Sequence, residues 1–103
     1  MNINTPNNPF KSALTYFNGV MNFDEAEQDI RNTHVNSTYG LRKSIKVIED
    51  YLNSGFDILE IRNFVEYEMN RAIGDPTGVQ QLEWIKSALA LEKRVLLDLE
   101  KEH

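Results

Sequence analysis

The chain has 103 residues, of which 41% are hydrophobic, which suits one compact domain with a single core and is too little for two. Its 11 basic and 16 acidic residues give a formal net charge of -5, which disfavours nucleic acid and anionic membranes as partners. The sequence contains no cysteine, which excludes disulfides, zinc-thiolate sites and thiol nucleophiles and is compatible with a reducing cytosol.

The amino-terminal segment MNINTPNNPF has neither a basic start nor an apolar segment. No run of about 18 apolar residues occurs elsewhere, so we expect no signal peptide, no transmembrane helix and a cytoplasmic protein. Residues 1–8 contain four Asn and one Pro and are almost without apolar side chains. This composition predicts a flexible arm over residues 1–8, followed by a single helical domain over residues 9–103.

Two short helices are predicted at the start of the domain. Asn8 can cap the first and Pro9 suits its first position, and an apolar face at helical spacing continues until a break near Gly19. Asn22 and Glu25 resemble a capping box for the second helix. The segment NTHVNST that follows is predicted to be a polar loop. The narrow buried stripe of the second helix consists of Phe23, Ala26 and Ile30.

The third and fourth helices are predicted to form a hairpin. Apolar residues recur at intervals of three and four from Leu41 onward, and Gly55 ends the third helix as a left-handed cap. Asp57 caps the fourth helix, with Glu60 as the second half of a capping box, and its apolar face continues until Gly74. Because only about three residues join these helices, we expect them to pack side by side.

The segment GDPTG, residues 74–78, looks at first like a phosphate-binding loop. Gly74 suits the end of the fourth helix, whereas Asp75 and Pro76 suit the cap and the first position of the next. Thr77 and Gln80 offer a second capping position two residues on. The loop lacks the lysine and the glycine spacing of a nucleotide-binding loop. We therefore interpret it as structural and expect the longest helix to follow it, to about residue 100.

The last helix is apolar on two faces. Such a helix is either the central helix of a bundle or contributes to a subunit interface, so homo-oligomerisation is an alternative to a wide core face. In either case Trp84 is expected to lie in an apolar contact. The first stripe consists of Leu82, Ile85, Leu89, Leu96 and Leu99. The second, which is the candidate interface, consists of Trp84, Ala88, Leu91 and Val95.

Catalysis is not expected. His34 lies in the predicted polar loop and His103 is the last residue, so neither has an evident orienting partner. Glu100 and His103 lack a second pair of metal ligands, and the acidic residues at the start of the second helix lack the pattern of a calcium loop. We therefore expect no catalytic residue, no metal site and no cofactor.

The segment IEDYLNSGFDILEIRNFV weakly resembles a helix-turn-helix unit. Bulky Tyr51 lies four residues before Gly55, where close helix packing favours Ala or Gly. Asp57 and Glu60 would meet phosphates with the wrong charge. Nucleic acid is therefore a disfavoured partner.

The segment YGLRKSIK carries a cluster of charge that breaks a local rule. Cations in the first turns of a helix oppose the helix dipole, and such departures are enriched at functional sites. One interpretation is a site for a nucleotide or another phosphorylated anion, in which the tyrosine stacks on a base. The other is a solvated face paired with Asp50 or with acids of a neighbouring helix. The cluster, here named the basic stripe, consists of Tyr39, Arg42, Lys43 and Lys46.

The sequence thus predicts an all-α protein, a small antiparallel bundle of four to five helices that binds rather than catalyses. The leading hypothesis is a small intracellular protein that masks or inhibits a partner protein. Its size and its Asn-rich arm would suit a phage or another mobile element. The alternatives are a protein that sequesters a nucleotide or phosphorylated anion on the basic stripe, and a helix-turn-helix DNA-binding protein.

Overall fold

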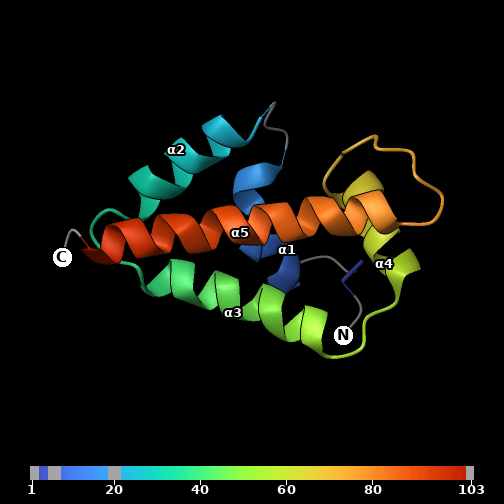
Figure 1. Cartoon of the computed structure of the whole chain (residues 1–103), viewed down its shortest axis with the longest axis horizontal. Coiled ribbons are helices and arrows are strands. Elements are labelled where there is room, and N and C mark those ends of the chain that lie inside the picture. The colour runs from blue at the N-terminus through green and yellow to red at the C-terminus, as the bar shows by residue number, and fades with distance from the viewer. Residues whose placement is uncertain (1–2, 5–7, 19–21, 102–103) are drawn as a thin grey trace.

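A computed structural model of the chain describes residues 3–4, 8–18 and 22–101. Within these ranges the chain is helical and contains no strand, which confirms the predicted all-α class (Figure 1). No helix in the described ranges has the length and apolar content required to cross a bilayer. The elements are α1 (Pro9–Ala13), the 3-10 turn η1 (Thr15–Phe17), α2 (Phe23–His34), α3 (Tyr39–Asn53), α4 (Ile58–Asn63), the π-helical turn η2 (Phe64–Glu68) and α5 (Val79–Lys101).

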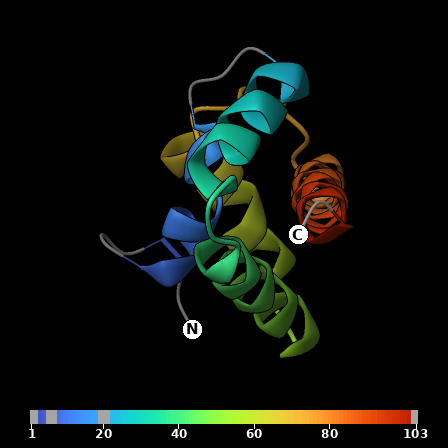
Figure 2. The same cartoon turned by 90° about the vertical axis from the view of Figure 1, so that its left-hand side faces the viewer.

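The long helix α5 is the element on which the others pack. Figure 1 shows it between α2 and α3, with α3 and α5 running in opposite directions. Figure 2 looks nearly along α5 and shows α2, α3 and α4 together on one side of it. All three helices contact α5, so its wide apolar face covers several neighbours within the chain. The apolar residues buried on this face are Ile85, Ala88, Leu91, Val95 and Leu99.

The helix starts follow the predicted caps. The side chain of Asn8 accepts a hydrogen bond from the Lys11 amide at 2.9 Å, and that of Asn22 accepts one from the Glu25 amide at 3.0 Å. Asp57 accepts a bond from the Leu59 amide at 2.9 Å. Each cap satisfies a backbone donor that the first turn of a helix leaves free.

Three residues of the predicted amino-terminal arm, Ile3, Asn4 and Asn8, make contacts with the helical domain or with each other. Ile3 is fully buried, and its backbone amide donates to Glu60 Oε1 at 3.1 Å. Asn4 donates its side-chain amide to the Glu60 carbonyl at 3.2 Å, and Asn8 donates to the Ile3 carbonyl at 2.8 Å. Ile3 and Asn4 are thereby joined to the first turn of α4. The rest of the predicted arm, residues 1–2 and 5–7, lies outside the described residues.

The helix α2 is longer than predicted and reaches His34, so the first part of NTHVNST is helical rather than a loop. His34 is buried at the end of this helix. Its ring nitrogen Nε2 lies 2.5 Å from the hydroxyl of Tyr16. This tertiary contact outweighs the polar local sequence, which by itself is typical of a loop.

The predicted hairpin of the third and fourth helices is wrong, because α4 packs against α5 while α3 packs against α1 and α5. Gly55, with a φ of +82°, turns the chain away at the end of α3. Glu60 does not complete the predicted capping box and instead accepts a hydrogen bond from Tyr51 at 2.8 Å, as well as the bond from Ile3. The first turn of α4 is thereby tied to the end of α3, although the two helices diverge.

The fourth helix also ends earlier than predicted. After α4 the chain widens into η2, where the Met69 amide bonds to the Phe64 carbonyl at 3.0 Å. The carboxylate of Glu66 then accepts the amides of Ile73 and Gly74, both at 2.8 Å. These bonds compete with helical ones for the same amides, so residues 70–73 lie outside the helix.

Candidate functional site

The basic stripe lies on the solvent-exposed side of the first half of α3. The Arg42 guanidinium pairs with Glu100 of α5, and Lys46 Nζ lies 3.1 Å from Asp50 Oδ2. Lys43 makes no ion pair within the described part of the chain, and Tyr39 is 75% exposed. Two of the three cations are therefore paired with Asp50 and with an acid of a neighbouring helix. These are the partners expected if the stripe is a solvated face.

A groove runs between α1 and α3 beside the basic stripe. One hollow of about 320 Å³ is lined by Ser12 and Ala13 of α1 and by Gly40, Lys43 and Ser44 of α3. A second of about 340 Å³ is lined by Asp50, Tyr51 and Ser54. Pro9 and Val47 line both hollows. The two hollows are therefore neighbours along α3, and together they are here named the α1/α3 groove.

The lining of the α1/α3 groove is mostly small or apolar. Serine, alanine and glycine leave room on both helices, while Val47 and the Tyr51 ring supply apolar surface. The charged residues are Lys43 at one end and Asp50 at the other, and Asp50 is engaged by Lys46. An apolar depression with few polar groups is the usual form of a site for a peptide segment or a small molecule.

The candidate subunit interface lies inside the chain. Ala88, Leu91 and Val95 are buried. The ring centre of Trp84 lies 5.9 Å from that of Phe17, which confirms the expected apolar contact of the tryptophan. Trp84 is half-buried, and the other three residues of this stripe contribute to the core of the chain.

The GDPTG segment has a structural role, as predicted. Asp75 accepts hydrogen bonds from the Gln80 amide at 3.0 Å and from the amide and hydroxyl of Thr77 at 2.9 and 2.7 Å. These bonds, that from Gln80 first, lower the pKa of the Asp75 carboxyl. Gly78 has a φ of +82°, and a Cβ at this position would lie 2.8 Å from the carbonyl oxygen of Ile58. The helix α5 starts at Val79, three residues later than the predicted start at Pro76.

The geometry adds nothing to the helix-turn-helix interpretation. The helix that would read DNA is α4, which is six residues long. Its cap residue Asp57 is exposed, where a carboxylate repels phosphate.

A buried polar cluster was missed by the sequence analysis. Glu92 of α5 is fully buried, and neither of its carboxylate oxygens has a hydrogen-bond partner in the described part of the chain. Burial raises the pKa of Glu92 to about 9. Tyr16 of η1 lies close enough that the charge of Glu92 contributes, after burial, to raising the pKa of the tyrosine. Tyr16 in turn bonds to His34, so this histidine does have an orienting partner, contrary to expectation.

One signal in the sequence could have identified Glu92. Positions 85, 88, 92, 95 and 99 follow one another at intervals of three, four, three and four, and all five are buried. This spacing describes a single core face, on which Glu92 is the middle residue. The two apolar stripes drawn from the sequence pass on either side of position 92 and leave the acid out.

Among the described residues, no group of His, Asp and Glu is arranged to hold a metal ion. Within the acidic start of α2, Glu27 is engaged by Arg31 and Arg94. The pairing of Glu100 with His103 falls partly outside the described residues, and Glu100 itself bonds to Arg42. Comparison of the chain with family models, with curated proteins and with solved structures finds no match.

Proposed function

We propose that the protein is a non-enzymatic cytoplasmic binding protein that masks a segment of a partner protein by holding it in the α1/α3 groove. The observation that carries this proposal is the position of the two hollows next to each other along α3, where they share Pro9 and Val47. Neighbouring hollows whose linings run from Gly40 to Ser54 of the chain suit an extended or helical segment better than a compact metabolite.

The lining indicates what the masked segment looks like. Small side chains on α1 and α3 allow close approach of a second backbone, and Val47 with Tyr51 provides the apolar contact. Lys43 has no ion pair within the described ranges, so it is the cation most available to an incoming acid. We therefore expect a partner segment with apolar side chains and an acidic residue near the Lys43 end.

A phosphorylated anion is the second candidate ligand, and one observation favours it. The side chain of the cap residue Thr38 accepts no hydrogen bond from the first turn of α3, and Gly40 of this turn lines the same hollow as Lys43 and Ser44. Backbone amides at a helix start together with a lysine and a hydroxyl can bind phosphate. In this alternative Lys43 is the principal cation, since Arg42 and Lys46 already have acidic partners.

The test is selection of short random peptides on the immobilised protein, followed by titration of the enriched peptides. Ser12→Trp places a large ring in the α1/α3 groove, and Ser87→Trp is the matched control because Ser87 is an exposed serine of α5 outside it. Enriched peptides should bind the unmodified protein and the control alike, and lose about tenfold or more in affinity for Ser12→Trp.

Two results would contradict the masking proposal. Peptides that bind both tryptophan variants equally would place recognition elsewhere, and a selection that enriches nothing would argue against a peptide ligand. Thermal shifts with inorganic phosphate or mononucleotides that vanish in Lys43→Ala would instead support the phosphorylated anion.

A further inference from the structure

The lining of the α1/α3 groove repeats along α3 with a period of seven residues. The α3 residues that line the first hollow are Gly40, Lys43, Ser44 and Val47. Those that line the second, including the residue that caps the end of the helix, are Val47, Asp50, Tyr51 and Ser54. Each member of the second set lies seven positions after a member of the first. Because seven residues make about two turns of an α-helix, the two hollows lie on the same side of α3, about 10 Å apart along its axis.

The opposite wall of the groove contains no large side chain. It is formed by α1, which contributes Pro9 to both hollows and Ser12 and Ala13 to the first. The hollows measure about 320 and 340 Å³, and a cavity of about 150 Å³ in a protein core is enough to hold a benzene ring. Each hollow can therefore receive one large apolar side chain.

An extended segment would find few partners for its backbone in this groove. The described residues form no strand whose edge could pair with it, and the backbone of α3 beyond its first turn is bonded within the helix. The hydroxyl of Ser54 already donates to the Tyr51 carbonyl at 2.8 Å, and that of Tyr51 donates to Glu60. Backbone groups that lose water without gaining a partner are costly, whereas a helix satisfies its own. The lining therefore favours a helical occupant.

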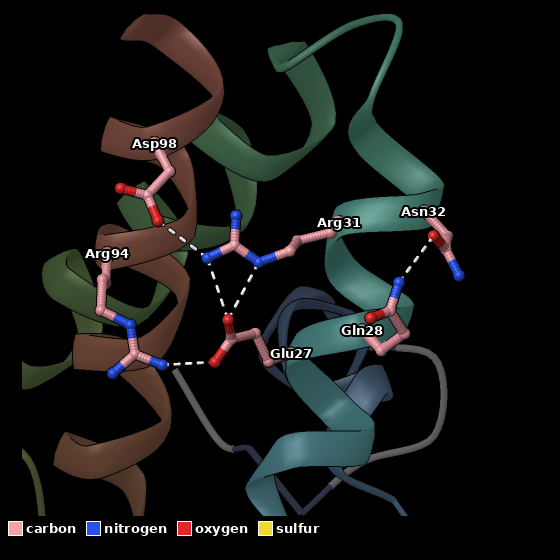
Figure 3. A network of polar contacts seen from close by, with 6 residues as sticks. All are labelled: Glu27, Gln28, Arg31, Asn32, Arg94 and Asp98. Atoms are coloured by element: carbon pink, nitrogen blue, oxygen red, sulfur yellow. Dashed lines mark hydrogen bonds and ion pairs between the residues drawn. The ribbon is translucent and has the colours of Figure 1, made fainter. Parts of the chain in front are cut away.

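Another hollow, of about 490 Å³ between α2 and α5, is less suited to an apolar helix because Glu27 and Arg94 line it. Figure 3 shows Arg31 of α2 between Glu27 and Asp98 of α5, with contacts of 2.9 and 2.8 Å, and Arg94 bonded to the second oxygen of Glu27. An apolar helix docked there would bury or separate these charges. By contrast, no ion pair within the described chain joins α1 to α3 across their groove.

We propose that the partner segment in the α1/α3 groove is an amphipathic α-helix that lies along α3 and inserts one large apolar side chain into each hollow. This proposal rests on the masking function proposed above. A helix advances about 1.5 Å per residue, so the two inserted side chains are seven positions apart in the partner sequence. An apolar residue three or four positions from each of them lies over Val47. An extended segment, which advances about 3.3 Å per residue, would cover the same distance in about three residues.

The test measures which peptide side chain enters which hollow. Peptides of about 15 residues are selected from a random library on the immobilised protein, and each apolar position of an enriched peptide is changed to Ala in turn. These peptides are titrated against the unmodified protein, Ser12→Trp, which fills the first hollow, and Ser54→Trp, which fills the second. An Ala change that costs about tenfold against the unmodified protein should cost almost nothing against the variant whose hollow receives that side chain. Ser87→Trp on α5 is the control and should behave as the unmodified protein does.

We expect one peptide position to couple with Ser12→Trp and another, seven positions away, to couple with Ser54→Trp. A proline placed midway between them should lower the affinity about tenfold or more, because it interrupts the helix. Asp50→Trp is a second variant for the second hollow should Ser54→Trp fail to fold, since Asp50 is an exposed residue of the same lining.

Three outcomes would overturn the helix while leaving the masking function in place: coupled positions only two to four residues apart, a single position coupled to both variants, or affinity that the proline does not change. The first would identify an extended segment. A selection that enriches no peptide, or only peptides that bind all three tryptophan variants as they bind the unmodified protein, would overturn the masking function and this proposal together.

Discussion

Two regions of the molecule each bury a glutamate side chain at least in part, but they differ in the hydrogen bonds that they donate to its carboxylate. Where α1, α3 and α4 meet, Glu60 accepts hydrogen bonds from the Ile3 amide and the Tyr51 hydroxyl. On the core face of α5, Glu92 is more deeply buried and accepts none within the described chain. The first glutamate joins three segments of the chain, whereas the second weakens the core face that it occupies.

The largest effect on stability is expected when two side chains of the apolar core are truncated, one in each region. Phe10 is fully buried, with its ring centre 4.7 Å from that of Tyr51 and 5.0 Å from that of Phe64. Phe10→Ala should lower the free energy of unfolding by about 4 kcal/mol, and Ile30→Ala in α2 by only about 2 kcal/mol. Urea denaturation measures both, and a larger loss for Ile30→Ala would reverse the proposed order of the two regions.

A second test replaces the well-bonded glutamate. Glu60→Gln keeps the shape of the side chain but removes the charge from its bonds with Ile3 and Tyr51. We expect a loss of about 1 kcal/mol in the free energy of unfolding at pH 7. Glu92→Gln, the matched change in the other region, should not destabilise at this pH. Equal losses for the two variants would remove the distinction between the regions.

The smallest effect is expected at the surface network of α2. The bond from Arg31 lowers the pKa of Asp98 below its ordinary value of 3.8. This ion pair therefore stabilises the fold above that value, and its contribution is lost as the pH falls through the lowered pKa. Arg31→Met should lower the melting temperature slightly at neutral pH and low salt, with no difference at high salt. A deficit independent of salt would indicate lost packing of the arginine stem instead.

Local patterns in the sequence predicted those parts of the fold that local physics controls. The caps at Asn8, Asn22 and Asp57 form as expected, because a cap needs only a polar side chain next to a helix start. The heptad-like spacing of α5 likewise gave its length and its wide buried face. The four residues of the basic stripe lie on one face of α3, because their spacing along the sequence places them on one face of any α-helix.

Contacts between distant segments account for the errors. Glu66 captures the amides of Ile73 and Gly74 and so ends the fourth helix early. Glu60 bonds to Ile3 and Tyr51 instead of completing the predicted capping box of α4. In each case the local sequence predicts that a charged side chain is exposed to solvent. The folded chain instead places a hydrogen-bond partner beside it.

The α1/α3 groove could not be predicted, because it depends on how two helices separated in the sequence lie against each other. The basic stripe lies beside this depression on α3, but its pattern does not indicate the depression. Of its four residues only Lys43 lines that depression. Gly40 and Ser44, which also line it, carry no charge and gave no signal in the sequence.

Gly40 also lies against the buried histidine. A Cβ at position 40 would come within 3.2 Å of His34 Cε1, and the adjacent ring nitrogen Nε2 bonds to Tyr16. A methyl group there would displace the ring and disturb this bond, so the glycine and the histidine are not independent. In related sequences we expect positions 34 and 40 to covary, with a larger residue at 40 accompanied by a smaller one at 34.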